Sequence, residues 1–223
     1  MSGDRPFTIA IMQPYFIPYA GYFRLFAASD LFVVYDCVQF PRRGWVHRNR
    51  LVDRSGALRW LTLPLQKAPR DVLIRDLRFA PEAAALMGER LRRFDLATAH
   101  EGAHGLIELI ERVDGSPVDY IVAILDRVAE YLDLPRNVIR SSTLNVPQSL
   151  RGQDRIIEIA RRVGATRYIN APGGRNLYEP AAFERAGIRL EFLPDYSGPA
   201  TSILGRVATQ TRDALAREIR ATV

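Results

Sequence analysis

The sequence predicts an α/β fold in which a Rossmann-like, mostly parallel sheet is flanked by helices and carries a helical insert. Two observations predict it. Short apolar segments alternate along the chain with amphipathic segments of helix length, as in folds built from strand–helix–strand units. The first apolar segment, FTIAIMQ at residues 7–13, is almost continuously apolar, which is typical of a strand buried on both faces of a parallel sheet.

The predicted elements follow one another with few long gaps. The predicted strands are 7–13, 31–40, 58–65, 137–143, the first part of 166–178, and 188–193. The predicted helices are 21–29, 81–96, 103–113, 116–134, 154–165, 180–187 and 211–221. Ser116 and Pro117 are typical of a helix start, and Gly164 is typical of a helix end. Residues 41–51 are basic and show neither a helical nor a strand period.

No internal repeat or low-complexity linker divides the chain, and its 223 residues suffice for one sizeable core. We therefore expect a single domain over residues 1–223, with a mainly helical segment around 81–135 as an insert or subdomain. Composition is that of an ordinary soluble protein, with 48% hydrophobic and 25% charged residues. No apolar run is long enough to span a bilayer, and the N-terminus lacks the apolar region of a secretory signal, so we expect a cytoplasmic protein.

The charged and metal-ligating residues narrow the function classes. The net charge of +6 allows an anionic partner, although arginines scattered along helices are equally typical of a solvated surface. Lys67 is the single lysine among 31 cationic side chains, which suggests a role that needs a compact ammonium group. Cys37 is the one cysteine, so an internal disulfide is excluded. His47, His100 and His104 show only one i, i+4 pair, and we predict no metal site.

Three unusual segments follow predicted strands, at the sheet edge where open parallel sheets bind ligands. PYFIPYAGYF follows the first strand, and its tyrosines suit stacking on a sugar or a base. A basic run follows the second strand, and its arginines suit phosphate or carboxylate. A glycine-rich loop follows the strand near residue 170. The candidate substrate-binding residues are Gln13, Tyr15, Tyr22, Gln39, Arg42, Arg43, Trp45, Arg48, Asn49, Asn170, Gly173 and Gly174.

Three further residues are candidates for catalysis. Asp36 is a lone acid at a strand end among cations and is the best candidate for a general base, although those cations would lower its pKa. Lys67 could reach the same pocket from the next strand end, and Tyr19 lies in the aromatic loop. Phe16 and Phe23, in contrast, are expected to pack a helix onto the sheet. No P-loop or GxGxxG motif is present.

The chain resembles the WbqC-like family. The resemblance rests on segments that span nearly the whole chain, namely MQPYFIPYAGYFRLF, YDCVQFPRRGWVHRNRL, WLTLPLQK, RGQDRIIEIARRVGATRYINAPGGRNLY and FLPDYSGPATSIL. It implies a single WbqC-like domain and an association with O-antigen, other surface polysaccharides or natural products, hence modification of a sugar or a small-molecule amine. Members commonly carry Asp in place of Cys37, Asn in place of His47 and an acid in place of Gly205, so roles of those acids do not transfer.

A second, weaker resemblance is to class I nucleotidylyltransferase-like folds. There a His-x-Gly-His loop holds nucleotide phosphates at a helix start, and the equivalent here is Tyr19-Ala20-Gly21-Tyr22. Tyrosine donates hydrogen bonds but does not become a cation near neutral pH, so adenylyl transfer would be lost or altered.

Two functions remain open. The first is a transferase that moves an acyl or aminoacyl group onto an amine of a nucleotide-linked sugar or related metabolite, with a nucleotide, acyl or charged-tRNA donor and no cofactor that the sequence shows. The second is a non-catalytic module that binds a nucleotide-sugar or RNA for a partner enzyme.

Overall fold

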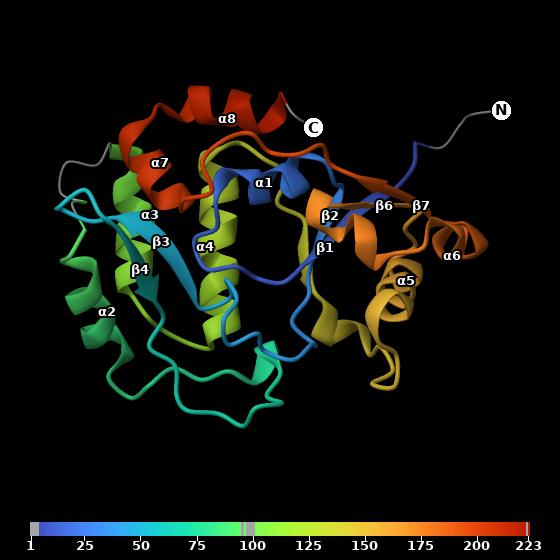
Figure 1. The fold of residues 1–223 in the computed structure, drawn as a ribbon, viewed down its shortest axis with the longest axis horizontal. Coiled ribbons are helices and arrows are strands. Elements are labelled where there is room, and N and C mark those ends of the chain that lie inside the picture. Colours follow the sequence, from blue (N-terminus) through green and yellow to red (C-terminus); the bar gives the residue numbers. More distant parts are fainter. Residues whose placement is uncertain (1–4, 95, 97–100, 222) are drawn as a thin grey trace.

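The computed structural model describes residues 5–94, 96, 101–221 and 223, and its centre is a five-stranded parallel sheet (Figure 1). The strands lie in the order β5-β2-β1-β6-β7, and every neighbouring pair is parallel. Numbered by their occurrence along the chain, these five strands have the spatial order 3-2-1-4-5 of Rossmann folds. The predicted α/β, Rossmann-like class is confirmed. The strand bounds are Thr8–Met12 (β1), Leu31–Val34 (β2), Val138–Arg140 (β5), Arg167–Asn170 (β6) and Arg189–Phe192 (β7).

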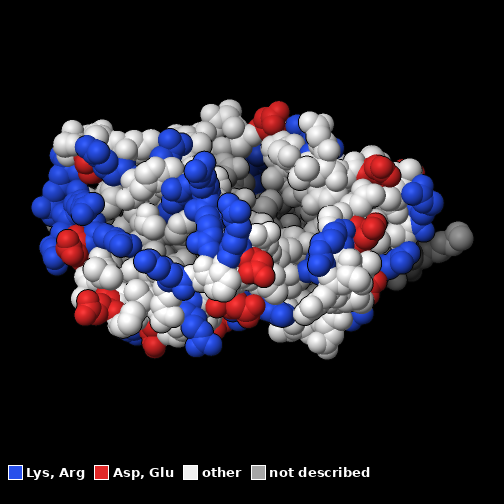
Figure 2. Space-filling model, turned by 60° about the horizontal axis from the view of Figure 1, so that its bottom comes forward, with Lys and Arg blue, Asp and Glu red and all other residues white. Residues whose placement is uncertain are grey.

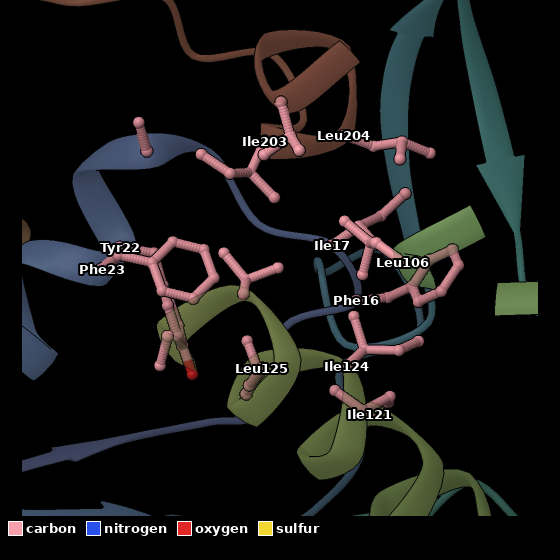
Figure 3. Packing of buried hydrophobic residues seen from close by; sticks show 14 of the residues in the cluster. Phe16, Ile17, Tyr22, Phe23, Leu106, Ile121, Ile124, Leu125, Ile203 and Leu204 are labelled. Carbon is pink, nitrogen blue, oxygen red and sulfur yellow. The ribbon is translucent and has the colours of Figure 1, made fainter. Parts of the chain in front are cut away.

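Helices cover both faces of the sheet because side chains along each strand point alternately to one face and the other. Ile9 and Ile11 of β1 share a buried cluster with α5 (Gly152–Arg162) and α6 (Pro180–Arg185). Ala10 belongs to the larger cluster on the other face. That cluster also contains residues of α1 (Ala20–Ala27), α4 (Pro117–Tyr131), α7 (Ile203–Thr209) and α8 (Arg212–Arg220). Figure 3 shows its centre, where side chains of α1, α4 and α7 meet.

The long connection between β2 and β5 forms the insert, residues 35–137. It contains an antiparallel hairpin of β3 (Arg48–Val52) and β4 (Leu58–Thr62) and a 3-10 turn at Ile74–Asp76, labelled η1. The helices α2 (Ala83–Leu91), α3 (Glu101–Glu111) and α4 complete it. The insert thus combines three helices with its own two-stranded sheet among the described residues.

Three differences from the sequence prediction have physical causes. The basic segment 41–51 was predicted to lack a strand, yet β3 begins at Arg48; its inward positions hold an amide, Asn49, beside Leu51, which hides the apolar alternation. The strand β2 ends at Val34, well before residue 40, because the chain leaves the sheet as it enters the insert. The helix α7 was not predicted; Ser202 caps it by accepting a hydrogen bond from the Leu204 amide.

Two further 3-10 segments follow strands, η2 (Ser141–Leu144) after β5 and η3 (Pro172–Leu177) after β6. Within the described ranges, every helix is too short or too polar to cross a membrane.

Candidate functional site

A cavity of about 530 Å³ lies beyond the carboxyl ends of β1 and β6, where the strand order of the sheet reverses. Rossmann-like sheets bind ligands at this position, because the two adjoining crossovers diverge there and leave a crevice. We call it the strand-end pocket. It is lined by Ile11, Met12, Gln13, Tyr15, Tyr19, Gly21, Tyr22, Leu25, Tyr35, Trp45, Ile156, Asn170, Ala171, Pro172, Gly173, Gly174, Leu177 and Tyr178.

The aromatic loop after β1 supplies one wall of the pocket. Tyr15 and Tyr19 are half-buried, and burial raises the pKa of each hydroxyl. Both hydroxyls therefore stay protonated at neutral pH and can donate hydrogen bonds. Tyr22 is nearly fully buried; its hydroxyl donates to the Gln13 carbonyl at 2.8 Å, and its ring centroid lies 5.4 Å from that of Tyr15. Tyr22 thus fixes the shape of the wall and offers the pocket little more than its ring.

Gly21 is required where α1 begins. A Cβ atom at this position would lie 2.3 Å from Cε2 of Tyr19 and 2.8 Å from Cγ of Tyr196. Glycine therefore lets these two rings close over the first turn of the helix, with their centroids 5.5 Å apart. Phe16 and Phe23 are fully buried, as the predicted packing role requires.

The aromatic loop is held in a strained conformation by groups outside it. Ile17 has φ 39°, which is unfavourable for a β-branched residue. Asn49 of β3 donates to the Phe16 carbonyl at 3.2 Å and to the Ile17 carbonyl at 2.9 Å. The Ser202 hydroxyl donates to the same Ile17 carbonyl at 2.8 Å. Since strain of this kind persists only where the surroundings fix it, the insert and the start of α7 together position the loop.

The segment after β6 supplies the opposite wall. The Asn170 side chain accepts a hydrogen bond from the Ala171 amide at 2.8 Å, which orients its amide nitrogen toward Gly174. A Cβ atom on Gly174 would lie 2.4 Å from that nitrogen and 3.3 Å from Cε2 of Tyr178. Gly173, in contrast, has open space around the position of a Cβ. Gly174 is therefore a packing requirement of the wall, whereas Gly173 leaves an opening.

Tyr35 and Tyr178 line the pocket without having been predicted. Burial raises the pKa of the Tyr35 hydroxyl, which again favours a protonated donor. Tyr178 packs edge-on against the buried Tyr168. The sequence positions of Tyr35 and Tyr178 could have indicated that they belong to the site. Tyr35 directly precedes Asp36 at the same strand end, and Tyr178 closes the glycine-rich segment after β6.

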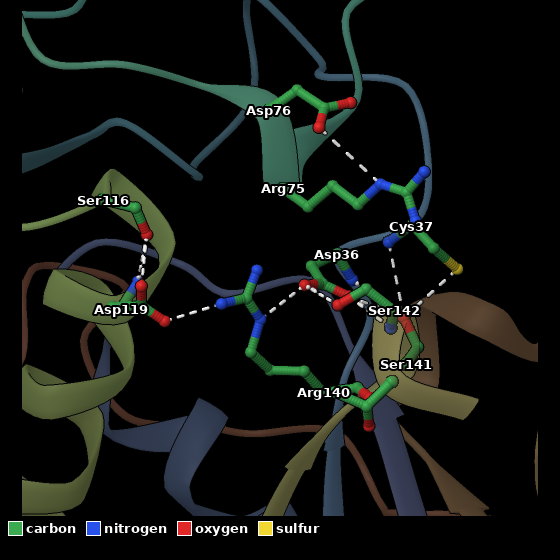
Figure 4. A network of polar contacts seen from close by, with 10 residues as sticks. Asp36, Cys37, Arg75, Asp76, Ser116, Asp119, Arg140, Ser141 and Ser142 are labelled. Carbon is green, nitrogen blue, oxygen red and sulfur yellow. Dashed lines mark hydrogen bonds and ion pairs between the residues drawn. The ribbon is translucent and has the colours of Figure 1, made fainter. Parts of the chain in front are cut away.

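Asp36 lies elsewhere and is fully buried (Figure 4). Its carboxylate accepts hydrogen bonds from the hydroxyls of Ser141 (3.0 Å) and Ser142 (2.7 Å) and from the Ser142 amide (2.9 Å). It also pairs with Arg140 at 2.7 Å, and Arg140 reaches Asp119 of α4 at 2.6 Å. A general base needs access to a substrate proton. A buried carboxylate that already accepts four hydrogen bonds instead joins the ends of β2 and β5 to the insert.

The remaining predicted residues also lie outside the lining of the strand-end pocket. Lys67 is exposed in the insert. Arg42 donates to the carbonyls of Ala68 and Pro69 at 2.6 and 2.9 Å. Arg48 donates to the Arg43 carbonyl at 2.9 Å. Of the fifteen predicted site residues, eight line the pocket, namely Gln13, Tyr15, Tyr19, Tyr22, Trp45, Asn170, Gly173 and Gly174.

A second cavity of about 360 Å³ shares Tyr35 with the strand-end pocket. Gln39, Arg151 and Arg155 are in its lining, and Gln39 donates to the Arg70 carbonyl at 2.9 Å. The guanidinium of Arg155 is largely occupied by backbone carbonyls, including that of the buried Cys37 at 2.7 Å. Arg151 is exposed and stands beside Gly152 at the start of α5.

In the part of the chain that the structure describes, no three His, Cys, Asp or Glu side chains come together as a metal site would need. His100, one half of the i, i+4 pair with His104, lies outside the described residues. His47 packs edge-on against Phe40, and burial together with nearby Arg48 lowers its pKa to about 4. It is therefore neutral near pH 7 and cannot supply a positive charge there.

Comparisons with known proteins give one family and one relative. A family model described as the WbqC-like protein family matches residues 13–200. The uncharacterized protein Rv1507c of Mycobacterium tuberculosis (strain ATCC 25618 / H37Rv) is 27% identical over 206 residues, which cover 85% of this chain and 83% of the relative. No solved structure matches this chain.

Proposed function

The chain belongs to the WbqC-like protein family, and we propose that it is a transferase. It moves an acyl or aminoacyl group onto an amine of a nucleotide-linked sugar, or of a related small metabolite, held in the strand-end pocket. Surface-polysaccharide or natural-product biosynthesis is the setting that the proposal implies. The observation that carries it is the pocket itself, a tyrosine-lined cavity of about 530 Å³ at the point where Rossmann-like sheets bind ligands.

The lining suits a polyhydroxylated or nucleoside ligand. Rings of Tyr15, Tyr19 and Trp45 offer faces for a sugar or base to stack on. The tyrosine hydroxyls and the side-chain amides of Gln13 and Asn170 offer neutral hydrogen bonds to ligand hydroxyls. The second cavity, with Arg151 in its lining, adjoins through Tyr35 and gives room and positive charge for phosphates of the same ligand.

Acyl transfer to an amine makes modest demands on the protein. The neutral amine attacks the carbonyl of an activated ester or thioester, a C–N bond forms, and the C–O or C–S bond breaks as the leaving group takes up a proton. Holding the two reactants together contributes most of the acceleration. Hydrogen-bond donors then stabilise the oxyanion that forms at the carbonyl. The protonated Tyr19 hydroxyl and the Asn170 amide nitrogen are the donors we assign, so neither Asp36 nor Lys67 is given a catalytic role.

A second candidate is the binding module without turnover. One observation favours it: among the described residues that line the strand-end pocket there is no Asp, Glu, Lys, Arg, His or Cys. Every proton transfer would then fall to the reactants or to tyrosines whose raised pKa makes them weak proton donors.

Two measurements on the purified protein test these candidates. Calorimetry compares binding of a nucleotide-linked amino sugar with binding of the matched nucleotide alone. Mass spectrometry then looks for the acylated product after incubation with acyl-CoA or with bulk aminoacyl-tRNA. We expect the wild-type protein to bind the nucleotide-linked amino sugar and to form the acylated product. Tyr19→Phe and Asn170→Ala should lose product formation, with or without a loss of binding. Tyr131→Phe, in α4 and outside the pocket lining, is the matched control. Binding without product would establish the module, and no binding would refute both candidates.

A further inference from the structure

The outward face of the β3–β4 hairpin carries arginines and tryptophans in direct contact. Arg50 lies opposite Trp60 in the register of the hairpin. The Cζ atom of Arg48 lies 4.3 Å from the Trp60 ring centroid, and that of Arg50 lies 5.7 Å from the rings of both Trp45 and Trp60. The two tryptophan rings are 5.3 Å apart, and Trp60 is 44% exposed. We call Trp45, Arg48, Arg50 and Trp60 the Trp–Arg platform.

In the part of the chain that the structure describes, no acidic side chain pairs with the arginines of the platform. Within the described ranges, neither Arg48 nor Arg50 takes part in an ion pair, and Arg48 donates only to backbone carbonyls. The Nε atom of Arg50 is buried, and no group of the described residues accepts a hydrogen bond from it. Contact with the indole rings offsets only part of the free energy that is lost when these guanidinium groups are partly removed from water. The platform therefore presents cations that an external anion can pair with.

The surroundings of the platform share its charge. Residues 41–80 contain ten Lys or Arg and three Asp or Glu, a net +7, while the whole chain has a net +6. This segment therefore carries the entire charge excess of the protein. Figure 2 shows Lys and Arg gathered on the half of one face that bears β3, β4 and α2. A purely solubilising charge would have no reason to concentrate in this way.

We propose that the Trp–Arg platform binds a single-stranded nucleic acid segment, with phosphates paired to its arginines and bases stacked on its exposed aromatic surface. Alternating cations and aromatic rings are the combination that single strands require, because their bases are free to stack. A duplex would engage the arginines alone. Few apolar side chains are exposed here beside Trp60, chiefly Val52 and Leu58, which is little area for insertion into a lipid surface.

The platform is continuous with the strand-end pocket, because Trp45 belongs to both. A strand bound on the platform would have one end at the pocket mouth. Resting on the proposed function, this identifies the donor as an acyl or aminoacyl ester of a terminal nucleotide. The amine of the pocket ligand attacks the ester carbonyl, the C–N bond forms, the ester C–O bond breaks, and the ribose hydroxyl leaves with the proton that the amine loses.

Fluorescence anisotropy tests the platform without any requirement for turnover. The probes are labelled single-stranded RNA of about a dozen nucleotides, DNA of the same sequence, the matching RNA duplex and heparin, at low and high salt. We expect the single strand to bind more tightly than the duplex. Trp60→Ala should weaken single-strand binding roughly tenfold, with partial recovery in Trp60→Phe. Arg48→Ala should lower the salt dependence of log K by about 0.7 for one lost phosphate contact.

Arg161→Ala is the matched control, since it removes an exposed arginine from α5 on the other face of the sheet. Circular dichroism and thermal unfolding check that each variant is folded. Equal binding of duplex, heparin and single strand, or full affinity in Trp60→Ala, would overturn the proposal. Sedimentation with phosphatidylglycerol vesicles is a further measurement, and binding to the vesicles with none to oligonucleotides would also overturn the proposal. A preference for DNA over RNA would overturn the ester-donor step.

The calorimetry with the nucleotide-linked amino sugar separates this inference from the proposed function. Sugar-nucleotide binding with no oligonucleotide binding overturns the platform alone. Oligonucleotide binding with no sugar-nucleotide binding overturns the pocket ligand, and with it the donor step.

Discussion

The loop after β1 and the segment after β2 leave the same edge of the sheet, and both are rich in polar and aromatic side chains. The first contributes much of the lining of the strand-end pocket, including Gln13, Tyr15 and Tyr19. The segment after β2 contributes Tyr35 and Trp45, whereas the Asp36 carboxylate accepts hydrogen bonds from within the fold. The difference follows from what each segment must connect. The first leads directly into α1, whereas the second must attach an insert of about a hundred residues to the sheet.

The comparison shows that a polar residue at a strand end has two competing uses. Where a long insert begins, buried polar groups are needed to satisfy one another and to fix the direction of the chain. Where a short crossover begins, the same edge remains open to a ligand. Substitutions in the two regions should therefore differ in whether they lower the free energy of unfolding or the affinity for a ligand.

The largest effect is expected for Asp36→Ala. It removes a fully buried carboxylate and leaves Arg140, Ser141 and Ser142 without their common acceptor. We expect the free energy of unfolding, measured by chemical denaturation, to fall by about 3 kcal/mol. This is the low end of the cost of breaking a buried ion pair, because Arg140 is partly exposed. Asp119→Ala, at the exposed end of the same arginine, should cost much less. A stable Asp36→Ala protein that has lost only activity would restore Asp36 as a catalytic residue.

A smaller loss is expected for Asn49→Ala, which removes the side chain that spans the two regions. The Phe16 carbonyl and the Arg50 amide would each lose a hydrogen bond, while the Ile17 carbonyl would keep Ser202. The expected cost is about 2 kcal/mol. Because Asn49 also holds the aromatic loop, ligand affinity in the strand-end pocket should fall as well. Calorimetry measures the affinity and chemical denaturation the stability, with the exposed Asn176→Ala as control. A loss of stability with unchanged ligand affinity would contradict the role of Asn49 in holding the aromatic loop.

Gly174→Ala tests the wall formed after β6. The new methyl group would meet the Asn170 amide at a distance that forces it to move, at a cost of about 1–2 kcal/mol for overpacking. Ligand affinity should fall because the displaced amide can no longer donate into the pocket. Gly173→Ala adds the same methyl group one residue earlier, in open space, and should leave the unfolding free energy nearly unchanged. Similar melting temperatures for the two variants would contradict this account of the wall.

Much of the fold could be predicted because it follows from local patterns. The continuous apolar run at 7–13 gave β1, and the capping residue Ser116 gave the start of α4. The strand β3 escaped prediction because its inward Asn49 is buried only by virtue of the carbonyls of a distant loop. The helix α7 escaped prediction because it has only seven residues and most of them are buried, which is too short and too uniform a stretch to show a helical period.

The candidate site was predicted where the strand-end rule acts alone, and not where tertiary contacts compete with it. Tyr15 and Tyr19 follow β1, and Asn170 is the last residue of β6. These two strands flank the reversal of strand order, so the placement of the three residues follows from the topology. The fate of Asp36 depends on Ser141 and Ser142, more than a hundred residues away, which no local pattern reveals. Sequence patterns therefore located the edge that carries the pocket, but did not indicate which side chains the fold itself would use.

The smallest effect concerns His47, which lies in the segment after β2 and whose neighbours include Phe40 and Arg48. Burial first, and then Arg48, lower its pKa to about 4 in the folded protein, against a value near 6.5 in an unfolded chain. Protons therefore bind the unfolded chain first as the pH falls. The contribution of neutral His47 to the free energy of unfolding is complete above about pH 6.5. It declines as the pH falls from about 6.5 to the folded pKa near 4.

His47→Gln should remove this contribution. After discounting for partial exposure, we expect the wild-type protein to lose about 1 kcal/mol more than the variant between neutral pH and pH 4. Unfolding curves at a series of pH values measure the difference, and acid losses from Asp53 and Glu218, whose pKa values are lowered, cancel because both proteins share them. Identical pH profiles would mean that His47 has the same pKa in the folded and the unfolded chain, so that it takes up its proton near pH 6.5 in the folded protein. It would then join the arginines of the basic segment as a site for anions, and the contrast between the two strand-end segments would weaken.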